Sequence, residues 1–312
     1  MEHLPTELLG EIFQYFSSGE LVQLFSSLNA RFSRLIRSLN RLAYCTSRND
    51  LSTHFFPYIR CLILDTAIDY RLDYFIHLRR LILVYVTDDF MSQLVHPSIL
   101  PNLEHLSLAH QVHPCFMPDL RRRIFSNSFP RLQSCYISRM RATLEADEWT
   151  QSPSLCAIEL NDIDSPGYRS ILAACPNLRS LKFKLRSRSN LTAPMFKHRK
   201  LKRLAIDLTY DDWPWDDHML EMYLACTPHL EQLSVYRWTS TDDCLVARLE
   251  HYDWLSSVVN QQLPSLVRFH FYLHVNCWSK AIRDASPSKS NQLQRDFHYA
   301  YQYRCQSRLL FY

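Results

Sequence analysis

Apolar residues recur at a fixed spacing along most of the 312-residue chain. The spacing is Leu-x-x-Leu-x-Leu, often preceded by Pro-x, with Ile, Val, Phe or Cys in some leucine positions. Nine copies are recognisable, and their leading apolar residues are Ile59, Leu78, Leu103, Leu132, Leu155, Leu178, Leu201, Leu230 and Leu266. The steps between these residues are 19, 25, 29, 23, 23, 23, 29 and 36. Steps of this size are typical of repeat proteins, so we expect an array of repeats.

Each copy predicts a short strand, because its last two apolar residues alternate with polar ones and place one face in a core. The segments between strands favour helices at 165–174 and 216–224. In the first of them Ser165 is placed to cap and Pro166 takes the first helical position. We interpret Cys175 and Cys226, which follow these helices, as small core residues.

The first 48 residues carry a different period, with apolar residues three and four apart. Three stripes are present, and they predict three short amphipathic helices. Their members are Leu8, Leu9, Ile12, Tyr15 and Phe16, then Leu21, Leu24, Phe25 and Leu28, then Phe32, Leu35, Ile36, Leu39 and Leu42. A module of this size buries little core, so we expect a partner to complete its surplus apolar positions.

The nine copies resemble leucine-rich repeats. The family's asparagine, three residues after the last leucine, is absent, since these positions hold residues such as Gln111 and Ile163. The array is therefore similar to irregular, helix-rich repeats. The resemblance implies an α/β solenoid, with a curved parallel sheet and outer helices.

Residues 4–36 resemble an F-box through Leu4-Pro5-x-Glu7-Leu8, then Ile12-Phe13-x-Tyr15-Phe16, and a downstream leucine, Leu21. The resemblance implies docking on a Skp-type adaptor, which is itself bound to a cullin. It implies adaptor contacts at Leu4, Pro5 and Leu8, with further contacts at Ile12 and Leu21. The sequence departs from the family at the third helix, where Leu28-Asn29-Ala30-Arg31-Phe32 replaces the usual Val-Cys-Lys/Arg-x-Trp.

Together the two resemblances imply a substrate-recognition subunit of an SCF-type cullin-RING ubiquitin ligase, whose repeats bind a protein target. The alternative is an adaptor-independent leucine-rich-repeat scaffold or binding protein, with the helices acting as a plain cap on the first repeat. We expect an F-box-like module at 1–48, repeats at 49–276 and a terminal cap or tail at 277–312. The repeat boundaries near 109–130 and 236–263 are left open.

The polar side chains between and beside the buried strand positions form the expected target surface. The candidates on strands are Tyr136, Lys182, Lys184, Arg203, Tyr236, Arg268 and Tyr272. Trp213 and Trp215 are added because they lie in a polar loop and exposed tryptophan is enriched at binding hot spots. For each of them, a solvated surface position or packing on the solenoid edge is the alternative.

Ten basic residues and no acidic residue occur between Arg179 and Arg203. The segment has four readings: binding of an acidic or phosphorylated target, a solvated face, nucleic-acid binding, or a nuclear-localisation signal. We favour the first two. The net charge of the chain is only +4, so it does not by itself indicate nucleic acid.

Several function classes find no support. The three glycines, at positions 10, 19 and 167, are too far apart for a phosphate-binding loop. No catalytic triad, metal-ligand set or cofactor motif is recognisable, so we expect a non-enzymatic protein without metal or cofactor. The acidic start lacks signal-peptide character, and the ten cysteines are scattered without C-x-x-C pairs. We therefore expect reduced thiols, no membrane insertion, and a cytoplasmic or nuclear location.

Overall fold

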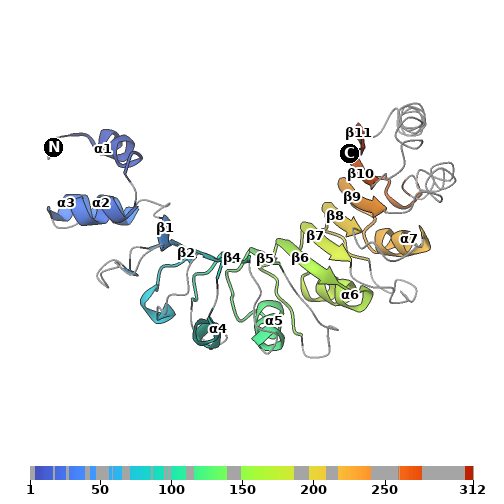
Figure 1. Cartoon of the computed structure of the whole chain (residues 1–312), viewed down its shortest axis with the longest axis horizontal. Helices are drawn as coiled ribbons and strands as arrows, with labels where there is room; N and C mark the ends of the chain where they lie inside the picture. Colours follow the sequence, from blue (N-terminus) through green and yellow to red (C-terminus); the bar gives the residue numbers. More distant parts are fainter. Residues whose placement is uncertain are drawn as a thin grey trace. The chain divides into compact units, whose positions relative to one another are not determined.

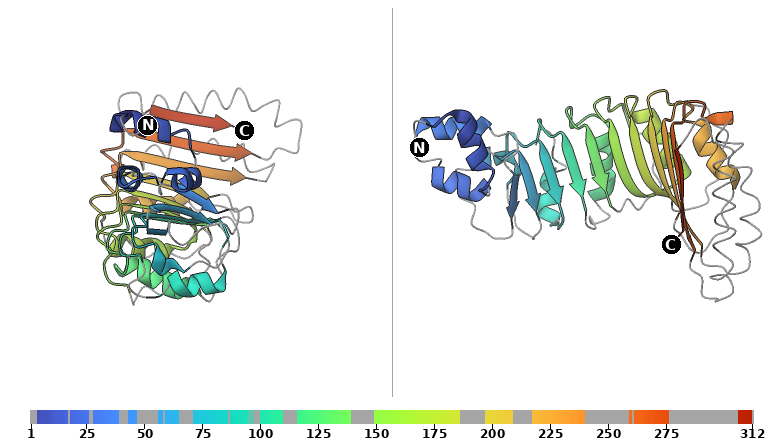
Figure 2. Two further views of the ribbon diagram at one scale, coloured as in Figure 1. Left: turned by 90° about the vertical axis from the view of Figure 1, so that its left-hand side faces the viewer. Right: turned by 90° about the horizontal axis from the view of Figure 1, so that it is seen from above.

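The computed structural model describes residues 4–16, 18–25, 28–38, 43–46, 56–57, 59–64, 71–85, 87–94, 96, 100–109, 116–138, 149–185, 197–208, 217–239, 259, 261–275 and 306–311. The chain divides into two compact units, Met1–Ser138 and Arg139–Tyr312. The repeats predicted over 49–276 are therefore shared between the two units. Each unit is α/β and contains a parallel sheet whose strands follow chain order, as predicted (Figures 1 and 2).

Three helices open the first unit: α1 (Thr6–Phe13), α2 (Ser18–Phe25) and α3 (Ala30–Ser38). Their apolar stripes meet in one core, formed by Leu9, Phe13, Leu21, Phe25, Phe32 and Ile36. The aromatic rings provide most of its volume, and the ring centroids of Phe13 and Phe25 lie 5.0 Å apart. The three predicted helices are thus confirmed, although α1 ends at Phe13, and Leu39 and Leu42 of the third stripe lie outside the described residues.

The sheet of the first unit contains β1 (Ala43–Thr46), β2 (Cys61–Leu64), β3 (Arg80–Leu83), β4 (His105–Leu108) and β5 (Ser134–Ile137). Each strand pairs in parallel with the next along the chain. Strand β1 falls within residues 1–48, which we had assigned wholly to the helical module. The reason is that residues 43–46 pair with β2, a contact that helical periodicity cannot reveal.

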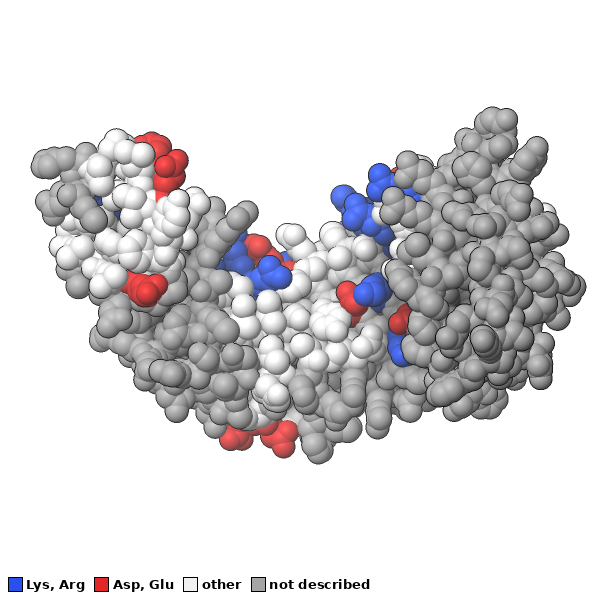
Figure 3. Space-filling view, turned by 45° about the horizontal axis from the view of Figure 1, so that its top comes forward, with Lys and Arg blue, Asp and Glu red and all other residues white. Residues whose placement is uncertain are grey.

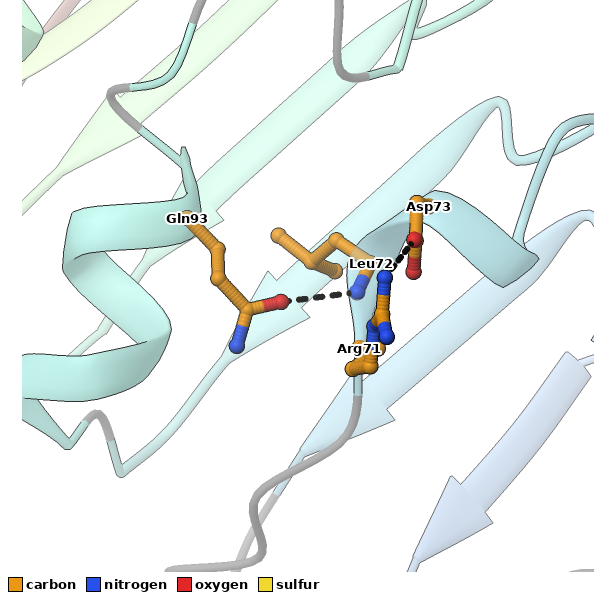
Figure 4. Close-up of polar contacts among 4 residues, drawn as sticks. All are labelled: Arg71, Leu72, Asp73 and Gln93. Atoms are coloured by element: carbon orange, nitrogen blue, oxygen red, sulfur yellow. Dashed lines mark hydrogen bonds and ion pairs between the residues drawn. The ribbon is translucent and has the colours of Figure 1, made fainter.

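The segments that connect successive strands are called return segments below. In the first unit they contain the short helix η2 (Leu72–Tyr74) and the helices α4 (Asp88–Leu94) and α5 (Met117–Phe125). Neighbouring return segments are joined by a side-chain bond. Gln93 Oε1 accepts a hydrogen bond of 2.9 Å from the Leu72 backbone N–H (Figure 4). Beside it, Arg71 and Asp73 form an exposed ion pair. Helix α5 lies within the long return segment at 109–130, whose boundaries the sequence left open.

The sheet of the second unit contains β6 (Ala157–Ile163), β7 (Ser180–Leu185), β8 (Arg203–Leu208), β9 (Gln232–Thr239), β10 (Arg268–Val275) and β11 (Gln306–Phe311). Helices α6 (Ser165–Ala174) and α7 (Asp217–Ala225) lie on one side of it (Figure 1). Strand β11 pairs in parallel with β10. The predicted cap at 277–312 thus adds a strand to the array.

One correction concerns the start of α6. The N-cap is Asp164, whose Oδ1 accepts a hydrogen bond of 2.9 Å from the Gly167 N–H. Ser165, the predicted cap, is buried instead, and its hydroxyl lies 2.7 Å from the Tyr223 hydroxyl. The prediction was wrong by one residue because Asp and Ser are almost equally good caps.

Every copy of the apolar motif forms the same turn and strand. The leading residue is buried, and in most copies its N–H donates to the carbonyl three residues earlier, as from Leu103 to Leu100 and from Leu178 to Cys175. In seven places the carbonyl just before a strand accepts two N–H groups from the next copy, and these carbonyls belong to Arg60, Arg79, Glu104, Cys156, Arg179, Lys202 and Glu231. Arg179 O, for example, accepts from Lys202 N at 2.9 Å and from Arg203 N at 2.9 Å. This column of carbonyls fixes the register between copies.

Two asparagines also bond neighbouring copies of the motif, from a position different from that of the family's asparagine. Asn102 Nδ2 donates to the carbonyl of Ile76, and Asn177 Nδ2 donates to the carbonyl of Pro153. Both asparagines stand in Pro-Asn-Leu, one residue before the leading leucine. Lys200 takes the same place in the next copy and donates to Asn177 Oδ1 at 2.6 Å.

Candidate functional site

The N-terminal helices carry apolar side chains that their own core does not cover. The exposed fractions are 46% for Leu8, 52% for Leu24, 58% for Leu28 and 89% for Tyr15. Each belongs to one of the predicted helical stripes, but the core uses only part of each stripe. The short helices leave too little room for all of these groups, so a surplus of apolar surface remains.

The five predicted adaptor contacts differ in their exposure. Pro5 and Leu8 are exposed, whereas Leu4 and Ile12 are partly buried against the helical core. Leu21 is only 4% exposed and belongs to that core. In this conformation Leu21 cannot touch a partner directly, because α2 turns this side chain inward. Leu24 and Leu28 are exposed although the sequence did not single them out as contacts, since a stripe alone does not say which of its members are covered.

The divergent third helix is well anchored. Asn29 caps it, because its Oδ1 accepts hydrogen bonds from the N–H groups of Arg31 at 2.9 Å and Phe32 at 3.0 Å. The Arg31 guanidinium donates to the Leu4 carbonyl, which joins α3 to the start of α1. Phe32 is 1% exposed and lies in the helical core. The unusual residues at 28–32 therefore have structural roles within the module.

A second candidate surface is the polar face of the second unit's sheet. Strand pairing aligns its side chains in rows that cross β6 to β10. The first row contains Ser180, Arg203, Gln232 and Arg268, the second Glu159, Lys182, Ala205, Ser234 and His270, and the third Lys184, Asp207, Tyr236 and Tyr272. Six of the seven strand candidates thus share one face. We call it the polar face.

The acid-free basic segment is less basic in space than in sequence. Lys182 Nζ lies 2.7 Å from Glu159 Oε1, and Lys202 Nζ lies 2.8 Å from Glu231 Oε1. Both acids belong to neighbouring copies, outside residues 179–203. Figure 3 shows Lys and Arg atoms beside Asp and Glu atoms at several places on the described surface. Exposed pairs of this kind add little stability, but they reduce the local positive potential.

Two arginines of the first row take no part in the ion pairs of the described residues. Arg203 and Arg268 are both exposed. Within the described part of the chain, neither guanidinium has a hydrogen-bond or ion-pair partner. Gln232 lies between them in the register, on β9.

The two tyrosines of the third row form a flat aromatic pair. The ring centroids of Tyr236 and Tyr272 are 4.4 Å apart, and their planes differ by 2°. Burial raises the pKa of the Tyr236 hydroxyl, and its contact with Tyr272 raises the pKa further. The Tyr236 hydroxyl is therefore neutral at physiological pH, and the stacked rings offer a planar, partly buried surface with polar ends.

Tyr136 lies on the corresponding face of the first unit, in a row with Ser107 and Ile82. The adjacent row holds His105 and Ser134, whose ring Nδ1 and hydroxyl oxygen lie 2.6 Å apart. Burial, followed by the nearby Arg80 charge, lowers the pKa of His105. The predicted loop tryptophans, Trp213 and Trp215, lie outside the described residues.

Features of other function classes were also sought in the described part of the chain. There, no three His, Cys, Asp or Glu side chains come together in a way that could hold a metal ion. No described helix combines the length and apolar character needed to cross a bilayer. The described cysteines Cys61, Cys135, Cys156, Cys175 and Cys226 are free thiols, and Cys175 and Cys226 are buried, as predicted.

Comparison with known proteins gives no family assignment. No protein-family model matches the sequence, and no curated protein shows significant similarity to it.

Proposed function

We propose that this chain is the substrate-recognition subunit of an SCF-type cullin-RING ubiquitin ligase. The N-terminal helices would dock on a Skp-type adaptor, and the sheet faces would bind a protein target. The proposal gives the chain no catalytic step, because ubiquitin transfer would be carried out by other subunits. It places the protein in the cytoplasm or the nucleus, where such ligases act.

The observation that carries the proposal is the surplus apolar surface on α1 and α2. Leu8 and Leu24 are about half exposed although six other apolar residues of the module form a closed core. Full burial of an exposed leucine contributes about 1.5–3 kcal/mol, so covering one that is already half buried contributes about half of that. Leu8 also stands in the Leu-Pro-x-Glu-Leu motif, together with the exposed Pro5. Motif and exposure therefore indicate the same surface.

The departure at the third helix does not weaken this surface. Asn29, Arg31 and Phe32 hold α3 against α1 and α2 by a cap, a hydrogen bond and a buried ring. The family's usual residues are replaced by others that still support a three-helix module. Contacts of α3 with an adaptor would then involve Leu28, which is 58% exposed.

The proposal is tested by binding of the purified full-length chain to a purified Skp-type adaptor. The variant Pro5→Ala/Leu8→Ala removes exposed groups only, so we expect an unchanged circular-dichroism spectrum and a loss of affinity of about tenfold or more. Ile76→Ala is the matched control, because Ile76 is 53% exposed and lies outside the helices. Undiminished adaptor binding by the double variant would refute the proposal.

The alternative is an adaptor-independent scaffold in which the helices only cap the repeats. One observation favours it: α2 lies in contact with β1, the first strand of the sheet. A terminal strand needs such a cover in any solenoid. Affinity purification of the native chain separates the two functions, since a scaffold would bring down neither a Skp-type protein nor a cullin.

A further inference from the structure

The first row of the polar face brings three hydrogen-bond donors to one place. Arg203, Gln232 and Arg268 occupy register-matched positions on β8, β9 and β10. Adjacent strands lie about 4.8 Å apart, so the two arginine Cα atoms are separated by about 10 Å with the glutamine between them. Arginine side chains are long enough for both guanidinium groups to reach a ligand above Gln232.

The ion pairs around this row leave Arg203 and Arg268 available to bind an anion. Lys182 and Lys202 are each held by a glutamate, at 2.7 Å and 2.8 Å. Arg203 and Arg268 have no such partner among the described residues. An anion at this position would thus gain two guanidinium groups without breaking an existing ion pair.

We infer that Arg203, Gln232 and Arg268 form the binding site for a phosphorylated serine or threonine of the target. This inference rests on the proposed function, because it assigns the target a chemical class. The number of donors favours phosphate over carboxylate. A phosphate monoester has three terminal oxygens, one for each of the three side chains, whereas a carboxylate has two, which a single arginine fork can satisfy.

The aromatic pair on the same strands extends the site. Tyr236 and Tyr272 lie four residues after Gln232 and Arg268, on the same face of β9 and β10. Four residues of extended chain span about 13 Å. An extended target segment lying along these strands would therefore place an apolar or aromatic side chain on the tyrosines, four residues from its phosphorylated residue.

A nucleic acid fits this surface less well. Glu159, Asp207 and Glu231 lie in or beside the rows, so negative charge recurs within one or two strand spacings of the arginines. A nucleic-acid backbone needs a continuous basic track, because each phosphate along it repels an acidic side chain. Acidic side chains therefore interrupt the positive charge along the described rows, whereas Arg203 and Arg268 lie close enough together to bind one phosphate.

The test uses the full-length chain and two synthetic peptides. Their sequences are acetyl-Gly-phosphoSer-Ala-Ser-Ala-Phe-Gly-amide and the same residues in reverse order, since the direction of the segment is not fixed. Affinity is measured by isothermal titration calorimetry, and the arginine Nε–H signals are followed by NMR. We expect one of the peptides to bind, with shifts at Arg203 and Arg268.

Two double variants decide which side chains matter. Arg203→Gln/Arg268→Gln should weaken binding by about tenfold or more, since charge-assisted hydrogen bonds are lost. Arg131→Gln/Arg199→Gln is the control, because it removes the same charge from two exposed turn positions that do not belong to the row. Its affinity should be that of the unaltered chain. Equal weakening by both double variants would overturn the inference.

Three further outcomes would also overturn the assignment. The first is that neither peptide binds at 1 mM, a concentration on the order of the Kd of the weakest specific complexes. The second is that a peptide with Glu in place of phosphoserine binds as tightly as the phosphopeptide. The third is that single-stranded RNA binds more tightly than the phosphopeptide. The proposed function is judged separately, because Arg203→Gln/Arg268→Gln should leave adaptor binding unchanged. Conversely, Pro5→Ala/Leu8→Ala should leave phosphopeptide binding unchanged.

Discussion

The imidazole Nε2 of His198 lies 3.0 Å from the backbone carbonyl oxygen of Cys175, in the preceding copy of the motif. The other ring nitrogen, Nδ1, accepts a hydrogen bond of 3.0 Å from the Leu201 N–H. Nδ1 therefore carries no proton, and Nε2 is the donor to Cys175. The backbone N–H of His198 also donates to the backbone carbonyl of Cys226 in the following copy. One buried, neutral histidine thus ties three copies together.

This arrangement predicts a loss of stability in mild acid. Burial, the largest cause, lowers the pKa of His198 from its ordinary value of 6.5. Above pH 6.5 the folded and unfolded chains are both neutral at this residue and the full stability is present. As the pH falls below 6.5, the unfolded chain takes up a proton that the folded chain excludes, so the free energy of unfolding decreases.

Urea denaturation at pH 7.5 and at pH 5.5 measures this effect. The decrease in unfolding free energy should be larger for the unaltered chain than for His198→Gln, which cannot titrate. His105 contributes the same acid-induced loss to both proteins, since burial also lowers its pKa. At pH 7.5 the variant should itself be about 1–3 kcal/mol less stable, because two backbone groups lose their partners. Identical pH dependence of the unfolding free energy in the two proteins would show that protonation of His198 does not cause the loss of stability.

The contact between α6 and α7 predicts a double-mutant result. The Ser165 hydroxyl lies 2.7 Å from the Tyr223 hydroxyl, and both side chains are completely buried. Tyr223→Phe should cost about 1–3 kcal/mol, because the buried Ser165 hydroxyl loses its hydrogen bond with Tyr223. Adding Ser165→Ala should recover part of that loss. Thermal unfolding of both single variants and the double variant gives the coupling energy, and simple additivity would contradict the hydrogen bond.

The side-chain hydrogen bonds of Asn177 predict a moderate loss of stability on substitution. Asn177→Ala removes the bond to Pro153 O and the acceptor for Lys200. Since both bonds are solvent-exposed, we expect a loss of about 1 kcal/mol and a fall in Tm of about 2–4 °C. Gln133→Ala is a suitable control, because Gln133 is exposed and its side chain forms no hydrogen bond among the described residues. Calorimetry should separate the two variants.

The packing of the helical core predicts that loss of one aromatic ring destabilises α1 to α3 without affecting the strands of the second unit. Phe32 is 1% exposed, and its ring centroid lies 5.7 Å from that of Phe25. Phe32→Ala should cost about 3–5 kcal/mol, more than a module of this size can absorb. Hydrogen exchange should then accelerate across α1 to α3 and stay unchanged in β7 to β9. Tyr15→Ala, at an 89% exposed position, should leave both regions as they were.

The repeated leucines predicted most of the fold because the pattern depends only on residues that are close together in the sequence. The spacing of Leu178, Leu181 and Phe183 places three side chains on one buried side, and the structure has them 0–1% exposed. The strands at 43–46 and 306–311 were not predicted, because neither segment carries the motif and pairing alone defines them.

The candidate sites were less predictable for the same reason. The pairing of Lys182 with Glu159 depends on the register between copies, which the sequence of one copy does not contain. Likewise, the helical stripes held both Leu21 and Leu24, but only packing decided that Leu21 is buried and Leu24 exposed. The stacking of Tyr236 on Tyr272 also needed the register, although both had been chosen as candidates.

The column of carbonyls has a consequence for how this chain tolerates change in length. Because Arg179 O and its counterparts set the register from the turn just before each strand, the segments that return behind the sheet do not influence it. Steps of 23, 29 and 36 residues yield aligned rows in the second unit. Insertions or deletions in the return segments would leave the order of side chains on the polar face unchanged, so the chemistry of this face and the length of these segments can vary independently.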